Sequence, residues 1–336
     1  MSKNSWGIAP LNWQSLIEEA LRRRKAEGLT QREHAALANV SIPTIAAFDR
    51  GEITLTLAKA FDILRVVGLV EEPQEGNAQN AFVNDAFARW QSLVNKLPPE
   101  SPGHFPNGWY RFDYYLEGEL KSVSLTEYED ILHKAVTRHS GWPVFHTPTR
   151  PDLGPYEIDG TIECWLSPQT EFIERMFNDP AHCDFWRAAP TGRLFLMRGY
   201  QEDGQETFPP GSIFDTTLPI WRMGEGLLHA ESLASLLRKK NDSDITVHFR
   251  ATYTGLSGRV LRSWANPMVG LLAEGHGARG DEAMLETIVP ATDIKARLAE
   301  HLFPLISSLY ERFGVAEIES GFVQAEVKRF LNARVS

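Results

Sequence analysis

The sequence contains 336 residues, 43% of them hydrophobic, and carries a formal net charge of −10 at pH 7. A chain of this length and apolar content is expected to form two or more globular domains, and no run approaches the ~20 apolar residues that a membrane span needs. Its two cysteines, Cys164 and Cys183, are too few for a disulfide framework or a four-cysteine zinc site. The opening MSKNSWGIAP lacks the apolar stretch of a signal peptide, so we expect a reduced, cytoplasmic protein.

The first 70 residues are predicted to form an all-α domain. Apolar residues recur at helical spacing from Trp13 to Leu21 and again from Leu55 to Val67. Between these stretches, LTQREHAALANVSIPTIAAFDRG predicts two short helices, Gln31–Ala38 and Ile42–Arg50, joined by a tight turn. This spacing is typical of a helix-turn-helix, whose second helix lies in the major groove of DNA.

The residue types in this segment match what that geometry needs. Thr30 can cap the first helix with Glu33 as its capping-box partner, and Ser41 can cap the second. Asn39 tolerates the positive φ that the turn demands, and Leu37 points to the core shared by the two helices. The remaining residues that fit the motif are Ala35, Val40, Pro43, Ile45, Phe48 and Gly51.

Together with the following TLTLAKAFDILRVVGL, this segment resembles the Xre/Cro-like helix-turn-helix regulators over roughly Leu11 to Leu69. By position, the resemblance implies that Gln31 and Thr44 touch phosphates, with the Gln31 amide adding to an anion site at a helix N-terminus. It also implies that three further residues face the base edges: Ile42, Pro43 and Ala47. The family usually has polar residues there. The side chains present here can only pack on thymine methyls or read DNA shape.

His34 is a second departure from the family, which usually has a leucine-like core residue at this position. An amphipathic helical hairpin used for dimerisation is the alternative interpretation of the same pattern.

The charge is unevenly distributed along the chain. Residues 1–70 hold nine Lys/Arg and seven Asp/Glu, a charge of +2, so the remainder carries −12. The run Arg22-Arg23-Arg24-Lys25 can reach the DNA backbone, or it can simply place favourable charge at a helix C-terminus. The acidic remainder would be repelled by DNA and fits an effector or assembly domain held off the duplex. The predicted DNA-binding residues are Arg22, Arg23, Arg24, Lys25, Gln31, Arg32, Ser41, Ile42, Pro43, Thr44, Ala47 and Arg50.

Residues 71–107 are predicted to be a linker with one helix. The stretch EEPQEGNAQN (71–80) is polar and acidic, a helix is expected from Ala81 to Lys96, and a proline-rich break follows. Residues 108–336 are predicted to form a larger α+β (or α/β) domain, because strand-like and helical runs alternate along it. The expected strands are Trp109–Tyr115, Gly160–Leu166, Arg193–Arg198, Phe214–Trp221 and Ile245–Tyr253. The expected helices are Leu125–His139, Gln169–Phe177, Gly224–Lys239, Ala291–Phe313 and Gly321–Val335.

Three stretches of this larger region are similar to the uncharacterised region that follows AlbA-type Schlafen ATP-binding domains in some bacterial proteins. They are GWPVFHTPTRPDLGPYEIDGTIECWL, DPAHCDFWRAAPTGRLFLMRGYQED and FDTTLPIWRMGEGLLHAESLASLL. The resemblance covers roughly Gly108 to Phe330 and implies a sensor or assembly module.

Patterns of catalytic residues are sparse, so we predict no enzyme, no metal site and no cofactor. Glu157, Asp159 and Glu163 alternate with apolar residues and could bind a divalent metal, but a solvated strand face is the preferred interpretation. His182-Cys183-Asp184 has no second ligand pair nearby, which zinc would require. The segment GLSG (255–258) has the wrong spacing for a nucleophile elbow and is predicted to be a hairpin turn between Tyr253 and Val260.

Large aromatic residues crowd the second region, several beside arginines. Such pairs could line a pocket for a planar or anionic ligand, whereas the alternative is that they fill a core. The aromatic residues are Trp109, Tyr110, Trp142, Phe145, Trp165, Phe185, Trp186, Trp221 and Trp264, and the arginines are Arg111, Arg187, Arg198, Arg222 and Arg262.

The sequence therefore predicts a transcriptional regulator, expected to be a repressor, that binds double-stranded DNA as a homodimer. The second domain is expected to sense a small-molecule or protein effector, to dimerise, or both. The alternatives are a protein-interaction or defence-associated module in which the helix-turn-helix docks protein, and an enzyme targeted by its helix-turn-helix.

Overall fold

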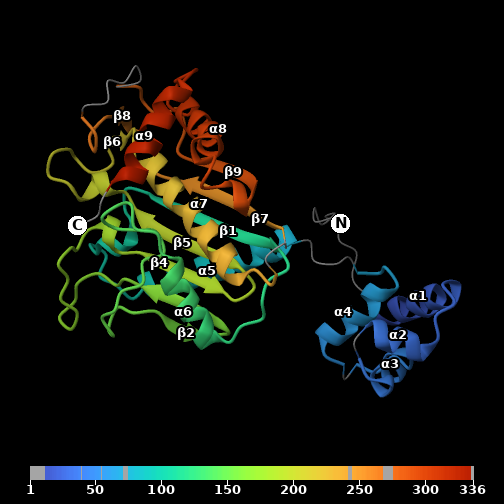
Figure 1. The fold of residues 1–336 in the computed structure, drawn as a ribbon. Helices are drawn as coiled ribbons and strands as arrows, with labels where there is room; N and C mark the ends of the chain where they lie inside the picture. The colour runs from blue at the N-terminus through green and yellow to red at the C-terminus, as the bar shows by residue number, and fades with distance from the viewer. Residues whose placement is uncertain are drawn as a thin grey trace, which may run out of the picture. The chain divides into compact units, whose positions relative to one another are not determined.

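The structure is a computed structural model that describes residues 12–38, 40–53, 55–70, 75–240, 244–267 and 275–333, with the backbone alone at 58 and 75–77. Contacts divide the chain into two compact units, 1–78 and 79–336 (Figure 1). Each unit has a hydrophobic core of its own.

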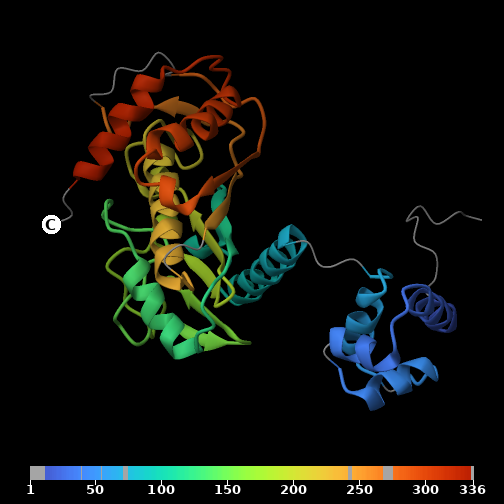
Figure 2. The same cartoon turned by 45° about the vertical axis from the view of Figure 1, so that its right-hand side comes forward.

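The first unit contains four short helices, drawn in blue in Figure 2: α1 (Trp13–Ala26), α2 (Gln31–Leu37), α3 (Ile42–Asp49) and α4 (Leu57–Val66). Local signals in the sequence define their ends. The Thr30–Glu33 capping box begins α2, and Ser41 caps α3. Gly51, at a φ of 79°, follows the end of α3 in a conformation that costs other residues energy. The core of the unit consists of Ile17, Ala20, Ala35, Ala38, Ile45, Phe48, Ile63, Leu64 and Val67.

Two residues of this unit differ from expectation. Leu37 was expected in the shared core, but 63% of its surface is exposed, because it falls outside the buried stripe formed by residues 34, 35 and 38. His34 is buried instead, and its Nε2 donates a hydrogen bond to the carbonyl oxygen of Ile63, 2.9 Å away. This bond ties α2 to α4 and explains how a polar residue occupies a core position. Asn39 lies outside the described residues.

The second unit is built on a seven-stranded sheet with strand order β2-β3-β4-β5-β1-β7-β9. Every pairing in it is antiparallel, so the fold is α+β and not of the parallel α/β kind. The strands are β1 (Trp109–Gly118), β2 (Tyr156–Ile158), β3 (Thr161–Trp165), β4 (Phe185–Ala189), β5 (Arg193–Gly199), β7 (Ile245–Tyr253) and β9 (Ala283–Pro290). A separate parallel pair joins β6 (Ile213–Asp215) to β8 (Val260–Arg262).

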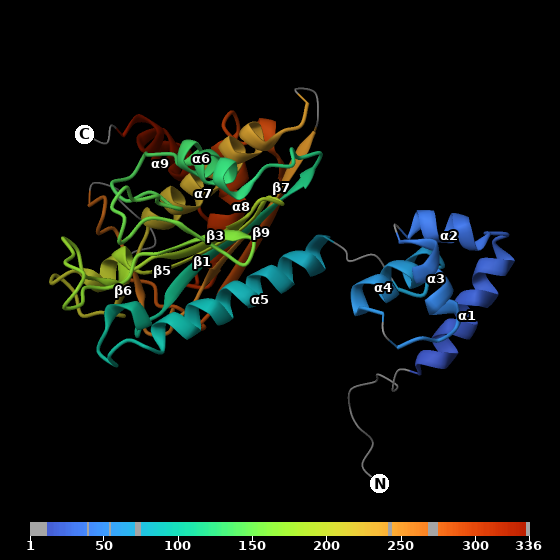
Figure 3. The same cartoon turned by 90° about the horizontal axis from the view of Figure 1, so that it is seen from below.

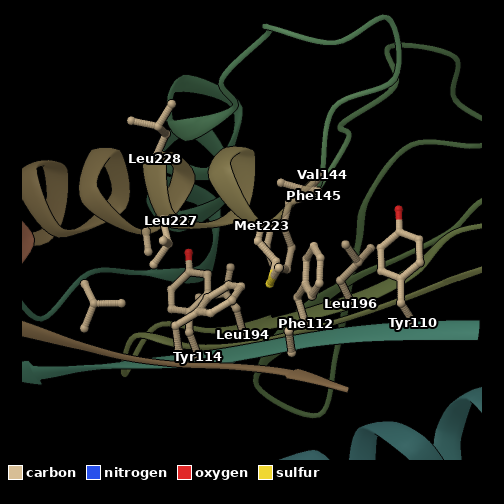
Figure 4. Packing of buried hydrophobic residues seen from close by; sticks show 14 of the residues in the cluster. Tyr110, Phe112, Tyr114, Val144, Phe145, Leu194, Leu196, Met223, Leu227 and Leu228 are labelled. Carbon is tan, nitrogen blue, oxygen red and sulfur yellow. The ribbon is translucent and has the colours of Figure 1, made fainter. Parts of the chain in front are cut away.

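Helices cover both faces of the sheet, as Figure 3 shows. One face carries α6 (Leu125–Ala135), α7 (Leu218–Leu237), α8 (Leu298–Glu311) and α9 (Ser320–Asn332). The other face carries α5 (Glu75–Val94), whose apolar residues pack on Phe185, Phe195 and Met197. The strands alternate accordingly, with Tyr110, Phe112 and Tyr114 of β1 directed toward α7 (Figure 4).

Several predicted elements are wrong in extent or type. The expected strand 214–221 is strand only at 213–215, because α7 begins at Leu218 with Pro219 in its first turn. No helix forms over 169–177. The expected hairpin between Tyr253 and Val260 is also wrong, since β8 pairs with β6 and not with β7.

The expected linker 71–107 holds the helix α5, which begins at Glu75, six residues before the helix start expected at Ala81. Because Val83, Ala86 and Trp90 of this helix are buried in a core with sheet residues, most of it is an integral part of the second unit. The contact-based division accordingly falls at 78/79.

Candidate functional site

The N-terminus of α3 is the exposed part of the predicted DNA-reading helix. Ser41, Ile42 and Pro43 are exposed, whereas Thr44 and Ala47 are half-buried. The Ser41 hydroxyl accepts from the backbone N–H of Thr44 at 3.3 Å and contacts the Thr44 hydroxyl at 2.8 Å. These bonds fix the start of the helix, so Ile42 and Pro43 are presented to solvent in a defined orientation.

Two of the predicted phosphate-contacting residues instead hold α3 in place. Arg24 donates two hydrogen bonds to the carboxylate of Asp49, at 3.0 and 2.8 Å, and both side chains are largely buried. The Gln31 amide donates to the same carboxylate at 2.7 Å. Asp49 therefore joins the ends of three helices, and Arg24 and Gln31 are committed to this network.

The other basic residues differ in their availability. Arg22 pairs with Glu19, and Arg50 pairs with Glu52 on the surface. Arg23 donates to Glu19 and to the carbonyl oxygens of Val67 and Gly68, so it closes the C-terminus of α4. Within the described ranges, Lys25 and Arg32 are exposed and make no ion pair, which leaves them the freest cations of the predicted set.

The N-terminus of α2 already holds a negative charge. The Glu33 carboxylate accepts from the backbone N–H and the hydroxyl of Thr30, at 2.9 and 2.7 Å. Both bonds lower the pKa of Glu33, and the bond from the Thr30 hydroxyl has the larger effect. A phosphate at this helix end would meet the carboxylate, so the anion site expected around Gln31 is unfavourable here.

Exposed apolar side chains outside α3 are a feature of the first unit that sequence reasoning missed. Besides Leu37, they include Ile53 at 87% and Leu57 at 68% exposure, whereas Ile42, at 49%, was expected to be accessible to DNA. Helical periodicity gave a partial signal of these exposed residues. Leu57 and Phe61 lie four residues apart on α4, so they share one face of the helix.

In the second unit, a tight hairpin separates Glu157 from Glu163, two of the acidic residues that were considered as metal ligands. Asp159 and Gly160, at φ of 47° and 73°, turn β2 back onto β3, so that Tyr156 pairs with Glu163 and Glu157 with Ile162. Glu163 is fully buried and accepts three hydrogen bonds from Arg89 and one from the Tyr156 hydroxyl.

The preferred interpretation of a solvated face is therefore wrong for Glu163, which is an ion-pair partner of α5. Glu157 and Asp159 are exposed.

The predicted His182-Cys183-Asp184 cluster consists of residues with separate structural roles. His182 bonds to Asp179 at 2.8 Å, and Asp184 forms an ion pair with the buried Arg198. Burial raises the pKa of the Cys183 thiol to about 12, which keeps it protonated. No group of three His, Cys, Asp or Glu side chains within the described ranges could hold a metal ion.

Most of the predicted aromatic residues of the second unit are packed in the cores, including Phe145, Phe185 and the nearly inaccessible Trp186. Some of the predicted residues line two cavities, which we call the inner and the outer cavity. Outside both cavities, Arg262 is exposed, and Arg111, Arg187 and Trp264 are half-buried.

The inner cavity, of about 20 Å³, lies among β1, β5, β7 and the start of α7. Its lining residues are Tyr110, Ala181, Arg198, Gly199, Tyr200, Gln201, Glu202, Phe214, Leu218, Pro219, Arg222 and Tyr253.

The outer cavity, of about 200 Å³, is lined mainly by apolar groups. Trp142, His146 and Phe177 form part of its wall, and Arg150 and Arg175 belong to its lining. Burial lowers the pKa of His146 to about 4, so this imidazole is neutral at physiological pH.

Comparison with known proteins identifies no relative: no protein-family model, no curated protein and no solved structure matches this chain. Among the described residues, no helix combines the length and the apolar character that crossing a bilayer requires.

Proposed function

We propose that this protein is a sequence-specific DNA-binding transcriptional regulator, acting as a repressor, whose first unit is a helix-turn-helix domain. One observation carries the proposal. The short helix α3 presents the exposed residues Ser41, Ile42 and Pro43 at its N-terminus while Asp49, Arg24 and Gln31 hold its other end. A rigidly supported helix with a free N-terminal turn suits insertion into a major groove.

Specificity in this proposal comes mainly from shape. Ile42 and Pro43 have no side-chain hydrogen-bond donors or acceptors, so they pack on thymine methyl groups, and Lys25 and Arg32 supply charge to the backbone. A single module of this size reads few base pairs. We therefore propose a homodimer that spans two half-sites about 34 Å, one helical turn, apart.

The second unit would supply the effector response. A ligand that favours one arrangement of the dimer changes the spacing of the two α3 helices and so changes operator affinity. The unit offers two cavities for such a ligand.

The test is DNA binding by the full chain, first by capture of genomic fragments and then by anisotropy titration of a selected duplex over a range of salt concentrations. We expect affinity to fall steeply with salt, and the variant Lys25→Ala/Arg32→Ala to weaken binding and flatten the salt dependence. The matched control is Lys59→Ala, an exposed cation on α4 outside the predicted interface. Equal binding by the double variant and the control would refute the assignment.

A second candidate is a protein-docking module, favoured by the exposed apolar residues Leu37, Ile42, Ile53 and Leu57. The variant Ile42→Ser separates the two functions. A DNA-binding role predicts altered sequence preference with the oligomeric state retained, whereas a docking role predicts loss of a protein complex and no DNA captured by the parent protein.

A further inference from the structure

The edge strand β9 lacks the features that normally keep the edge of a sheet from pairing. It is the last strand of the seven-stranded sheet, beside β7 (Figure 1), and it is eight residues long. Its register with β7 continues without a bulge from Ala283 to Pro290. The strand contains no lysine, and its single proline is its last residue. Short length, lysine, an internal proline and bulges are the usual protections of an edge, so this edge is open to a further strand.

The backbone of β9 has hydrogen-bonding groups that no other strand uses. In an antiparallel sheet, alternate residues of an edge strand direct their N–H and C=O groups away from the neighbouring strand. Among the residues that the structure describes, no backbone hydrogen bond joins 283–290 to a segment other than β7. The outward-directed groups of β9 are therefore available to a strand that lies beside it.

The opposite edge of the sheet has the protections that β9 lacks. β2 has only three residues, Tyr156–Ile158, and the tight turn at Asp159 and Gly160 follows it directly. Its middle residue, Glu157, is an exposed carboxylate. Of the two edges, only β9 is long enough and uninterrupted enough for extended pairing.

Exposed apolar side chains on β9 are a second sign that this edge is covered in the working protein. Met284 and Ile288 are 59% and 66% exposed, and the exposed Glu286 lies between them on the same side of the strand. On the other side, Leu285 and Val289 are buried in the core. The helix α5 packs on β4 and β5 and leaves Met284 and Ile288 uncovered.

The side chains of β9 form a pattern that is nearly symmetric about Glu286. Apolar residues lie two positions away on both sides, Met284 and Ile288, and three positions away on both sides, Ala283 and Val289. If two β9 strands pair antiparallel about a two-fold axis at Glu286, each residue faces the residue at the same distance on the other side of the axis. Met284 then lies opposite Ile288 of the second copy, and Ile288 opposite Met284, so apolar groups meet at both ends.

The charges around the axis are balanced within each chain. Like charges directly opposite each other are unfavourable, and this register places the two Glu286 carboxylates together. Arg250 of β7 lies 3.7 Å from Glu286, and it also pairs with Asp113, which Arg111 contacts in turn. Each chain therefore brings two arginines and two carboxylates to this face of the sheet, and the Glu286 charge has a cation beside it.

We propose that β9 is the contact surface of a homodimer, in which two copies of this chain pair their β9 strands antiparallel about a two-fold axis at Glu286. The pairing joins the two sheets into one continuous sheet and sets each Met284 against Ile288 of the second copy. The symmetry of the pattern favours a second copy over an extended peptide of another protein, which needs no such symmetry. This contact deepens the proposed function, and it rests on that function only for the consequence that two α3 helices reach one DNA.

The first experiment measures the association of the full chain without DNA, by sedimentation velocity over a range of protein concentrations. We expect a monomer–dimer equilibrium whose dissociation constant rises about tenfold in Met284→Lys, because both symmetric contacts with Ile288 are lost at once. The matched control is Met176→Lys, the same change at a methionine that is 90% exposed and lies outside β9. A parent protein that is monomeric at every concentration overturns the proposal, as do equal dissociation constants for the two variants.

A disulfide cross-link tests the register. Glu286→Cys places two thiols opposite each other at the axis, with their Cα atoms about 4.5–5.5 Å apart, a separation that a disulfide can span. The matched control is Glu282→Cys, at an exposed carboxylate four residues from the axis, where the two thiols are about 27 Å apart. The native Cys164 and Cys183 are buried. We expect mild oxidation to give a covalent dimer from Glu286→Cys alone, and any other outcome overturns the two-fold pairing at Glu286.

Failure of this contact and failure of the proposed function are distinguishable, because association is measured without DNA. A parent protein that captures DNA but stays monomeric overturns only the β9 contact. A parent protein that dimerises through β9 but captures no DNA overturns only the DNA-binding assignment.

Discussion

Glu202→Gln provides a test of the buried charges that surround the inner cavity. In the folded protein, burial and the nearby Asp215 raise the pKa of Glu202 from 4.5 to about 7. An acid with a raised pKa stabilises the fold fully below pH 4.5 and loses that contribution as the pH rises through 7. The change from 4.5 to about 7 corresponds to about 3 kcal/mol. Glutamine keeps the acceptor for the Asp215 N–H and cannot ionise.

We therefore expect the variant to match the parent protein near pH 4 and to exceed it by up to about 3 kcal/mol at pH 8. The assay is urea unfolding at several pH values in a zwitterionic buffer, followed by tryptophan fluorescence. Most tryptophans lie in the second unit, so the signal reports mainly on its unfolding. Glu157→Gln, at an exposed position of β2, is the control. A difference between variant and parent that stays constant from pH 5 to pH 8, or that grows toward low pH, would refute the reasoning.

Three further predictions follow from the contacts described. Arg24→Ala leaves the Asp49 carboxylate without its main partner, and we expect a loss of about 2 kcal/mol, visible as faster hydrogen exchange in α1 and α3. Gly160→Ala places a side chain at a φ of 73° and should lower the free energy of unfolding in urea by about 1 kcal/mol. An unchanged free energy of unfolding would contradict this prediction. Arg32→Ala should lower the slope of log Kd against log salt by about 1, and an unchanged slope, as expected for Lys59→Ala, would remove Arg32 from the interface.

The sequence predicts the first unit well because its signals are local. A capping box at Thr30–Glu33, a cap at Ser41 and glycine at 51 lie within a few residues of the helix ends they define. Leu37 shows the limit of such reasoning, since a helix of seven residues has too few apolar positions for periodicity to identify its buried face.

Sequence reasoning missed three strands of the second unit, β4, β8 and the eight-residue β9, because their identity depends on distant partners. β4 is five residues long and buried on both faces between β3 and β5, so it lacks the alternation that marks a half-buried strand. The β2–β3 hairpin did carry a signal, the Asp159-Gly160 dipeptide between Ile158 and Thr161, which is a strong indicator of a two-residue turn.

The candidate sites were predictable only in part. Composition indicated a cluster of aromatic residues and arginines, and Tyr110, Arg198 and Arg222 do line one cavity. The partners that decide what each group can do lie far along the chain, as with Arg89 and Glu163 or Arg24 and Asp49. Such pairings depend on the folded chain, and a single sequence gives no information about them.

The central position of β1 has a consequence for the synthesis of this protein. Phe112 of β1 pairs with Leu196 on one side and Ala251 on the other, and Phe330 of α9 is fully buried in the same core. A ribosome that has produced β1 must therefore add more than a hundred residues before both neighbours of that strand exist. The helices α1–α4, with a core of their own, can form as soon as they emerge. We therefore expect the nascent chain to expose the apolar residues of β1 during this interval, when the strand is open to non-native contacts.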